Sequence, residues 1–416
     1  MAARAEEVDV LVVGGGPAGL AAAAAAAVEG ASVLLVERRS SIGHPVHTSG
    51  ATSFETMSRW RIPRRLWHPV SRARFVSSRE EADFEFSSPP LCVIDVRGTY
   101  RWLADRAAES GARVETGVRF VAPIVEGRRT CGAELTGRGA ARRVRAGVVI
   151  DASGYRAAVS KLVGLHPGFS RFGVGYEYEL HAPRCRQDEV VVVVGERHAP
   201  TGYGWVFPWG DGRVRVGVGL HHSDTRQDPK QHLDALVDDS AAIGVDLSGA
   251  EIVEHHVGLV PAERLPDRLV GDGVLAVGDA ACQATLVAGE GIRLSLAAGD
   301  LAGHVAARAV AAVMRAPPRS CPMRAAFAPS SGVACVSATR STAGSHASMT
   351  PVGTRISAGC AASHRLRSRS CSSRSSRSLS LGRSRAHRGR GCRSRTPSAQ
   401  RRSAGSPDGV RALEVR

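Results

Sequence analysis

Residues 8–19 read VDVLVVGGGPAG, a continuous apolar run followed by a glycine-rich turn and the start of an alanine-rich segment that extends to residue 30. The apolar run is typical of a strand buried on both faces, and the alanines strongly favour a helix. A second apolar run at residues 32–37 ends at Glu37. The order strand, helix, strand predicts the first unit of a parallel sheet and therefore an α/β fold.

The glycines of this turn match the GxGxxG fingerprint of a dinucleotide-binding loop. Gly14 permits the tight turn, Gly16 lets the backbone approach a pyrophosphate, and Gly19 lets helix and strand pack closely. The helix start offers free N–H groups to the phosphates, and Glu37 can accept hydrogen bonds from a ribose diol. Glycine-rich turns are common, so the prediction depends on the flanking strands and on Glu37.

A second glycine motif favours FAD over NAD as the dinucleotide. Residues 273–281 read GVLAVGDAA, and GEGI follows at residues 289–292 before an apolar segment over 293–315 that we expect to be helical. Asp279 can bind a ribityl chain there, and the helix start can face a flavin ring. The two motifs together predict a Rossmann-like FAD-binding domain assembled from discontinuous segments.

Between the two motifs, residues 171–220 alternate or run in β-branched and aromatic residues, which predicts a mostly antiparallel sheet. We therefore expect an α/β protein with an inserted β-sheet substrate domain. The predicted boundaries are 1–165 for the first part of the FAD-binding domain, 166–267 for the substrate domain, 268–316 for the last part of the FAD-binding domain, and 317–416 for a disordered tail.

The net charge of +16 resides in that tail, which holds 19 arginines against two acidic residues, whereas residues 1–316 hold 36 basic and 37 acidic residues. The body therefore gives no reason to expect a nucleic-acid partner. A non-enzymatic role for the tail in binding RNA is disfavoured, because its one aromatic residue, Phe327, offers little base stacking. No stretch is expected to span a membrane, so we predict a cytoplasmic protein and leave peripheral membrane contact open.

Several motifs resemble known flavoproteins. GGGPAG, DASG at residues 151–154, and GDAA are similar to the flavin fold of para-hydroxybenzoate hydroxylase. HPVHTSG at 44–50, YGWVFP at 203–208 and GEGIR at 289–293 resemble the narrower geranylgeranyl reductase family. The resemblance implies reduction of carbon–carbon double bonds in a prenyl chain by hydride transfer from reduced flavin. The alternative is a flavin-dependent monooxygenase or halogenase on the same fold, although Tyr203 and Phe207 differ from the halogenase strand motif.

The resemblance also implies site residues. Those expected to contact FAD are Gly14, Gly16, Ala18, Gly19, Glu37, Thr48, Ser49, Ala51, Arg97, Asp279, Gly291 and Ile292. Arg97 is placed just before a helix that starts near Tyr100. Those expected to line the prenyl pocket are Tyr203, Trp205, Phe207 and Pro208; alternation puts the three aromatics on one face of a strand, which would equally suit an ordinary core.

Other aspects of the site stay open or depart from the family. Many relatives carry a cysteine where Thr48 stands and a proline where Leu286 stands. We assign no catalytic residue.

We expect no metal site, because His44, His47, His255 and His256 are not accompanied by a cysteine or by an HExxH arrangement. Only one dinucleotide fingerprint is present, so an external electron donor is needed, and NADPH and a ferredoxin-like protein both remain open.

The tail itself carries a hypothesis. After residue 316 the apolar periodicity ends, and Arg, Ser, Pro, Gly and five cysteines follow in the proportions expected of GC-rich codons translated in a shifted frame. The rival is a genuine basic tail that binds anionic membrane. Resequencing the gene distinguishes the two: we expect another frame after codon 316 to encode amphipathic helices, and their absence would refute the frameshift.

Overall fold

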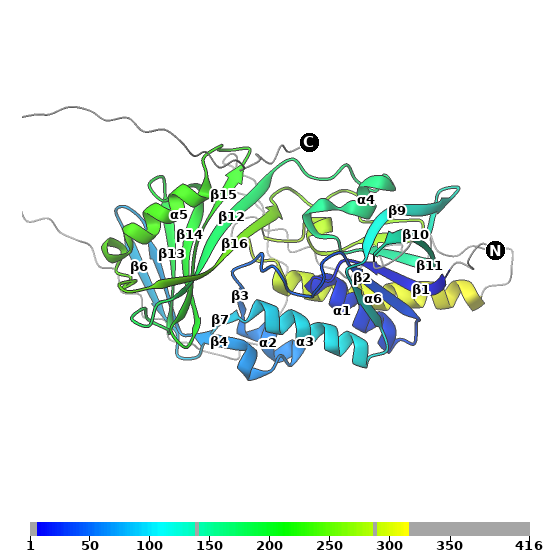
Figure 1. The fold of residues 1–416 in the computed structure, drawn as a ribbon, viewed down its shortest axis with the longest axis horizontal. Coiled ribbons are helices and arrows are strands. Elements are labelled where there is room, and N and C mark those ends of the chain that lie inside the picture. Colours follow the sequence, from blue (N-terminus) through cyan, green and yellow to red (C-terminus); the bar gives the residue numbers. More distant parts are fainter. Residues whose placement is uncertain (1–5, 138–140, 286–288, 316–416) are drawn as a thin grey trace, which may run out of the picture. The chain divides into compact units, whose positions relative to one another are not determined.

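The structure is a computed structural model that describes residues 6–137, 141–285 and 289–315 (Figure 1). The predicted tail at 317–416 and the substitution at Leu286 lie outside the described residues.

The predicted parallel sheet is present. Its strands are β1 (Glu6–Val13), β2 (Val33–Glu37), β8 (Arg113–Thr116), β11 (Arg142–Asp151) and β18 (Val274–Ala276). They run in the order β18-β11-β1-β2-β8, and each neighbouring pair is parallel. Antiparallel additions come from β17 (Val270–Gly271) beside β18 and from β9 (Arg119–Glu126) and β10 (Arg129–Thr136), with β10 paired to β11. The Rossmann-like domain built from discontinuous segments is confirmed.

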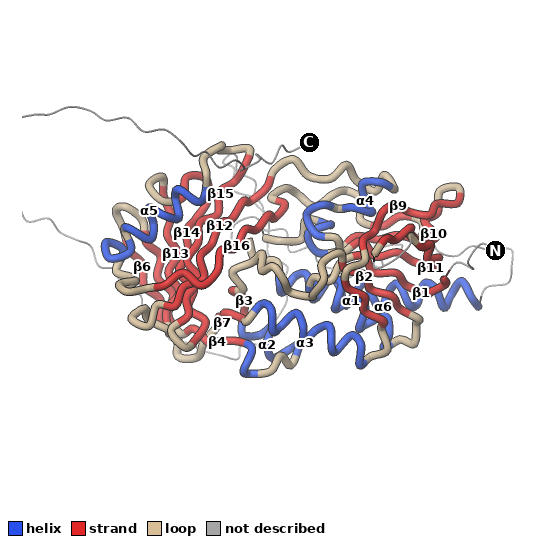
Figure 2. The backbone as a smooth tube through the Cα atoms, in the orientation of Figure 1, coloured by secondary structure: helices blue, strands red, loops and turns tan. Residues whose placement is uncertain are grey.

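Three helices pack on one face of this sheet, as the tube of Figure 2 shows with helices in blue and strands in red. They are α1 (Pro17–Val28), α3 (Val96–Glu109) and α6 (Ile292–Arg315), while the short α4 (Ala158–Leu162) lies against β9 and β11. Alternate residues of the buried strands supply both faces: Val10 and Val12 face the helices, and Leu11 and Val13 face the opposite core. A strand buried on both faces explains the unbroken apolar run in the sequence.

The expectation about membrane spans needs correction. By length and composition alone, Ile292–Val313 of α6 would suit a membrane span, and 44% of its most apolar stretch is buried inside the protein. The buried side chains include Leu296 and Ala306, which belong to the core beneath α1. Core helices and membrane spans share this composition, so the sequence does not separate them.

A second sheet holds the residues predicted for the substrate domain. Its strands, in spatial order, are β16 (Glu251–Pro261), β12 (Phe172–His181), β15 (Arg213–His222), β14 (Ala199–Gly210), β13 (Glu189–Gly195), β5 (Arg72–Val76) and β6 (Glu81–Glu85). Only the β13–β5 pair is parallel, so the mostly antiparallel sheet is confirmed. Because β5 and β6 precede residue 166, this sheet draws on two separate segments; the domain boundaries themselves stay a prediction.

Different elements pack on the two faces of the second sheet. One face packs on α5 (Pro229–Asp238) and the 3-10 helix η3 (Ser240–Ile243) through residues such as Val216, Val218 and Leu236. The other shares a core with a small sheet of β3 (Ala51–Ser53), β7 (Leu91–Ile94) and β4 (Trp67–Val70), which leads into α2 (Phe54–Trp60) and the 3-10 helix η1 (Arg64–Leu66). This small sheet was not predicted from the sequence, because its strands are only three or four residues long.

The contact between α1 and α6 yields a prediction. A Cβ on Gly299 would overlap the backbone of Ala18, and one on Gly303 would overlap the carbonyl oxygen of Ala22. Alanine is normally the better helix former by about 1 kcal/mol. We expect Gly299→Ala nevertheless to lower the free energy of unfolding by about 1–3 kcal/mol, because the helices must move apart.

Thermal denaturation provides the measurement for this prediction. Leu301→Ala is the control, since Leu301 lies on the same helix and is 49% exposed. A Gly299→Ala protein that melts at or above the wild-type temperature would show that the helices do not depend on this close approach.

Candidate functional site

The glycine turn between β1 and α1 is shaped by backbone contacts. Gly14 has φ +115°, and a Cβ there would overlap the carbonyl oxygen of Ala152; a Cβ on Gly19 would overlap the carbonyl oxygen of Gly14. Gly16, by contrast, faces open space and forms the N-cap of α1 without any side-chain cap. The uncapped N–H groups of the first helical turn, which includes the buried Ala18, suit an anion such as a pyrophosphate.

Glu37 stands at the end of β2 and braces this turn. Its Oε2 accepts a hydrogen bond from the N–H of Gly15 at 2.8 Å, and its Oε1 accepts one from the N–H of Arg39 at 2.8 Å. Each carboxylate oxygen has a second lone pair, so both can still accept from ribose hydroxyls. The sequence spacing pointed to the ribose role and did not reveal the bracing role.

The late glycine motif gathers Asp279, Gly291 and Ile292. Asp279 lies in the 3-10 helix η4 (Gly278–Ala281), and burial raises its pKa to about 6. A Cβ on Gly291 would stand 3.9 Å from Oδ1 of Asp279, and the buried Ile292 begins α6. A carboxyl group that burial leaves poorly solvated gains from hydrogen bonds to hydroxyls such as those of a ribityl chain.

Arg97 is placed differently from the sequence prediction. Helix α3 begins at Val96 rather than near Tyr100, because Asp95 caps it by accepting a hydrogen bond from the N–H of Gly98 at 2.9 Å. Arg97 therefore lies in the first helical turn. Its Nη2 donates to Glu254 at 3.0 Å, whereas its Nε is buried and has no hydrogen-bond partner among the residues that the structure describes. A buried, unpaired N–H favours a ligand acceptor at this point.

The loop carrying Thr48, Ser49 and Ala51 is held by a residue that the sequence analysis missed. Arg215 of β15 is 2% exposed and donates through Nη1 to the carbonyl oxygens of Ser49 at 2.8 Å and Ile94 at 3.0 Å. Thr48 is partly buried, and its hydroxyl lies 3.5 Å from the N–H of Gly50. The loop and the start of α3 thus share one anchor on the second sheet.

The aromatic strand β14 lies next to the late glycine motif. Tyr203, Trp205 and Phe207 occupy one face of β14. The ring centroids of Tyr203 and Trp205 are 5.8 Å apart, and those of Trp205 and Phe207 are 6.2 Å apart. The hydroxyl of Tyr203 lies 3.5 Å from the position of a Cβ on Gly289, and burial raises the pKa of that hydroxyl to about 12. Pro208 follows and is buried. The structure therefore brings together the two motifs on which the prenyl-reductase interpretation depends.

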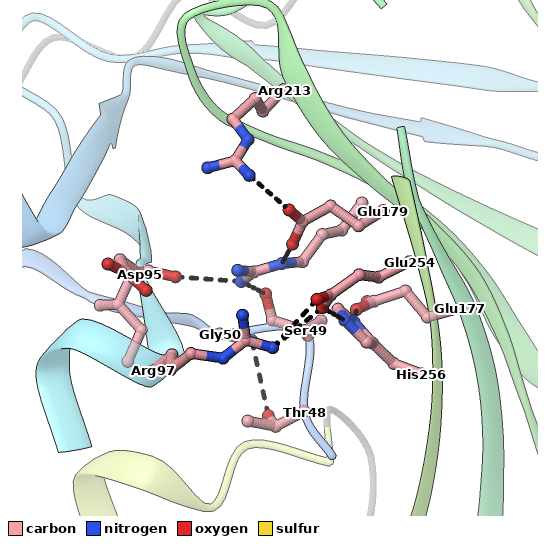
Figure 3. Close-up of polar contacts among 12 residues, drawn as sticks. Thr48, Ser49, Gly50, Asp95, Arg97, Glu177, Glu179, Arg213, Glu254 and His256 are labelled. Atoms are coloured by element: carbon pink, nitrogen blue, oxygen red, sulfur yellow. Dashed lines mark hydrogen bonds and ion pairs between the residues drawn. The ribbon is translucent and has the colours of Figure 1, made fainter. Parts of the chain in front are cut away.

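Charged side chains from three strands of the second sheet and from the start of α3 form one cluster (Figure 3). It consists of Glu177 and Glu179 on β12, Arg213 and Arg215 on β15, Glu254 and His256 on β16, and Arg97 on α3. Trp205 joins it by donating from Nε1 to Oε2 of Glu177 at 2.7 Å. Alternation along the strands marks these residues as one face, but no sequence signal pairs strands so far apart in the chain.

The four histidines considered above are not gathered into one group. His44 lies 3.2 Å from Nη2 of Arg97, His47 contacts the carbonyl oxygen of Val257 at 2.8 Å, and His256 lies between two glutamates. Among the residues that the structure describes, no group of three or more metal-ligating side chains is present.

The placement of the predicted site residues falls into two groups. The first surrounds the start of α1, where Gly14, Gly16, Ala18, Gly19 and Glu37 adjoin one another. The second contains Asp279, Gly291 and Ile292, with Tyr203 nearby through Gly289. Arg97 and the loop at 48–51 are linked to the second sheet by Glu254 and Arg215. Their contacts with FAD and with a prenyl chain remain predictions.

Comparison with known proteins identifies the family. Residues 9–171 match a model described as FAD dependent oxidoreductase, and residues 172–260 match one described as geranylgeranyl reductase catalytic domain. A digeranylgeranylglycerophospholipid reductase of Methanopyrus kandleri is 34% identical over 73% of this chain and 78% of that enzyme.

Solved structures agree with the sequence relatives. A geranylgeranyl bacteriochlorophyll reductase-like protein of Thermoplasma acidophilum superposes with a TM-score of 0.70 at 26% identity, covering 74% of this chain and 80% of that one. A flavin-dependent brominase superposes with a TM-score of 0.61 at 18% identity, covering 73% of this chain and 80% of the brominase. This similarity shows a shared fold only. The chain belongs to the geranylgeranyl reductase family of FAD-dependent oxidoreductases.

Proposed function

We propose that this protein saturates carbon–carbon double bonds in the geranylgeranyl chains of a glycerophospholipid. The observation that carries the proposal is the meeting of two motifs: the aromatic face of β14 reaches the GEGI turn through Tyr203 and Gly289. An apolar aromatic surface beside the flavin motif suits a hydrocarbon chain with no polar groups of its own. The relatives named as digeranylgeranylglycerophospholipid reductases support the choice of substrate.

The residues present fit FAD. The uncapped start of α1 and the open side of Gly16 would receive the pyrophosphate, Glu37 the ribose, and Asp279 the ribityl chain. The unpaired Nε–H of Arg97 offers a donor to the flavin side. Each of these groups lacks a protein partner or has spare hydrogen-bonding capacity, which is what a cofactor site requires.

Bound reduced FAD supplies a hydride to one carbon of the double bond, and a proton must reach the other carbon. The chain's own contribution is to position the olefin and to exclude water. Trp205 and Phe207 are 8% and 7% exposed, so they provide a dry surface. Their position is held by backbone pairing of β14 with β13 and β15 rather than by a loop, which favours a rigid placement of the two rings.

The alternative, a flavin-dependent monooxygenase or halogenase, draws support only from the shared fold. Tyr203 and Phe207 depart from the halogenase strand motif, and fold alone does not assign chemistry. We further propose an external electron donor, NADPH or a ferredoxin-like protein, since the chain offers one dinucleotide fingerprint. A cytoplasmic location with contact at the membrane surface would give access to a lipid substrate.

Product mass tests the reaction class. Purified protein, reduced anaerobically with dithionite and supplied with a digeranylgeranyl glycerophospholipid, is expected to add about 2 mass units for each double bond. In air, a monooxygenase would instead add about 16. Mass spectrometry of the recovered lipid is the measurement, with boiled protein as the control. Unchanged lipid under both conditions, from protein that carries FAD, would contradict the proposed substrate.

Substitutions at the two ends of the FAD site test cofactor binding. Glu37→Ala and Asp279→Ala should each weaken FAD binding by about 1–3 kcal/mol, or roughly 5- to 150-fold in Kd, because each leaves cofactor hydroxyls unpaired. Quenching of flavin fluorescence measures Kd. Glu7→Ala is the matched control, since Glu7 is an exposed glutamate on β1. Equal FAD affinity in all three variants and the wild type would overturn the assignment of both residues.

A further inference from the structure

His256 lies between two carboxylates in the charged cluster of Figure 3. Its side chain is 4% exposed; Nδ1 is 2.9 Å from Oε1 of Glu177, and Nε2 is 3.0 Å from Oε2 of Glu254. Ionised carboxylates only accept hydrogen bonds, and a neutral imidazole has a single N–H to donate. Both short contacts are satisfied together only when the ring carries two N–H groups. The geometry therefore corresponds to an imidazolium.

Each carboxylate also holds a second residue, and the two residues belong to different parts of the site. Glu177 accepts from Nε1 of Trp205 on the aromatic strand at 2.7 Å. Glu254 accepts from Nη2 of Arg97 at the start of α3 at 3.0 Å. A continuous series of hydrogen bonds thus runs from Trp205 through Glu177, His256 and Glu254 to Arg97. His256 stands in the middle of this series. It is the one residue of the five whose two hydrogen bonds both depend on a proton that titrates near neutral pH.

Charged side chains from each element packed against His256 surround its ring. Glu177 and Glu179 come from β12, Arg213 and Arg215 from β15, Glu254 from β16 itself, and Arg97 from α3. Burial lowers the pKa of His256, but the hydrogen bonds with Glu177 and Glu254 outweigh burial and raise the pKa above its ordinary value. The hydrogen bond from His256 in turn lowers the pKa of Glu254.

We propose that protonated His256 is a positioning residue that holds Trp205 on the substrate side and Arg97 on the flavin side at the same time. The part of this inference that concerns Arg97 rests on the predicted contact between Arg97 and FAD, and the part that concerns Trp205 rests on the proposed function. Loss of the proton leaves one carboxylate without its donor, so either Trp205 or Arg97 loses its support.

The pH dependence has a definite sign. Because the pKa of His256 is raised in the folded protein, its stabilising contribution is complete below about pH 6.5 and is lost as the pH rises through the folded value. FAD affinity and the environment of Trp205 should therefore change together on the alkaline side. If His256 served only as packing, neither FAD affinity nor the environment of Trp205 would follow its protonation.

Two substitutions separate the two contacts. In His256→Asn the shorter amide can donate near the Nδ1 position, to Glu177, but cannot reach Glu254. In His256→Gln the longer amide can donate near the Nε2 position, to Glu254, and loses Glu177. We expect His256→Asn to bind FAD about 10-fold more weakly while retaining the Trp205 signal. His256→Gln should bind FAD more nearly like the wild type and shift the Trp205 signal.

The measurements are FAD affinity by flavin fluorescence and the emission of Trp205, taken in FAD-free protein as the difference from Trp205→Phe. His255→Gln is the matched control, because the exposed neighbour His255 faces the rings of Tyr176 and Tyr178 on the opposite side of β16. The proposal is supported by the reciprocal pattern in the two His256 variants. It is overturned if both variants keep both signals, or if both lose both equally, as a general structural role would require.

If the His256 variants do not fold, pH profiles of the wild-type protein test the proposal instead. Between about pH 6 and about pH 9, FAD affinity and Trp205 emission should change in the same range; two flat profiles would overturn the proposal. Neither readout uses a prenyl lipid, so failed turnover with intact reciprocal effects would remove the proposed substrate alone. With an active lipid substrate, His256→Gln should raise KM more than it lowers kcat.

Discussion

Close backbone packing around α1 is the constraint on which the rest of the structure depends. Gly14 and Gly19 let the helix start approach β1 and β11, while Gly299 and Gly303 let α6 lie against α1. A side chain at any of these positions would occupy space that backbone atoms fill. The uncapped helix start, the late glycine motif and the sheet are therefore held in one arrangement, and the cofactor motifs from the two ends of the body meet because of it.

Buried charge connects this domain to the second sheet. Arg215 donates to the carbonyl oxygens of Ser49 and Ile94 and to Glu179, so three of the five N–H groups of its guanidinium have protein acceptors. Removing charges from water costs several kcal/mol per ion, and such a cost is tolerated only where geometry satisfies the groups. Ion pairs of this kind define register more than they add stability. Here Arg215 links the loop at residues 48–51 to the second sheet through the carbonyl oxygen of Ser49.

Most features visible in the sequence were local ones. Gly14 and Gly19 belong to a strand–turn–helix unit whose spacing predicts close backbone approach, and the alternation of Tyr203, Trp205 and Phe207 predicts that their rings share one face of a strand. The start of α3 was misplaced because the cap at Asp95 was not recognised among flanking apolar residues. The strands β3, β4 and β7 were missed since short strands carry too little periodicity.

The sequence by itself determined the Rossmann-like domain, the FAD motifs and the mostly antiparallel character of the second sheet, because each follows from residue spacing within one or two neighbouring elements. Only the tertiary structure decided that Glu177 and Glu254 enclose His256, that Glu37 braces Gly15, and that Arg215 reaches Ser49 and Ile94. Apart from the Glu254–His256 contact within β16, these contacts join residues from 22 to 166 positions apart. Such pairings depend on strand register and helix packing, which one chain's residue pattern does not encode in readable form.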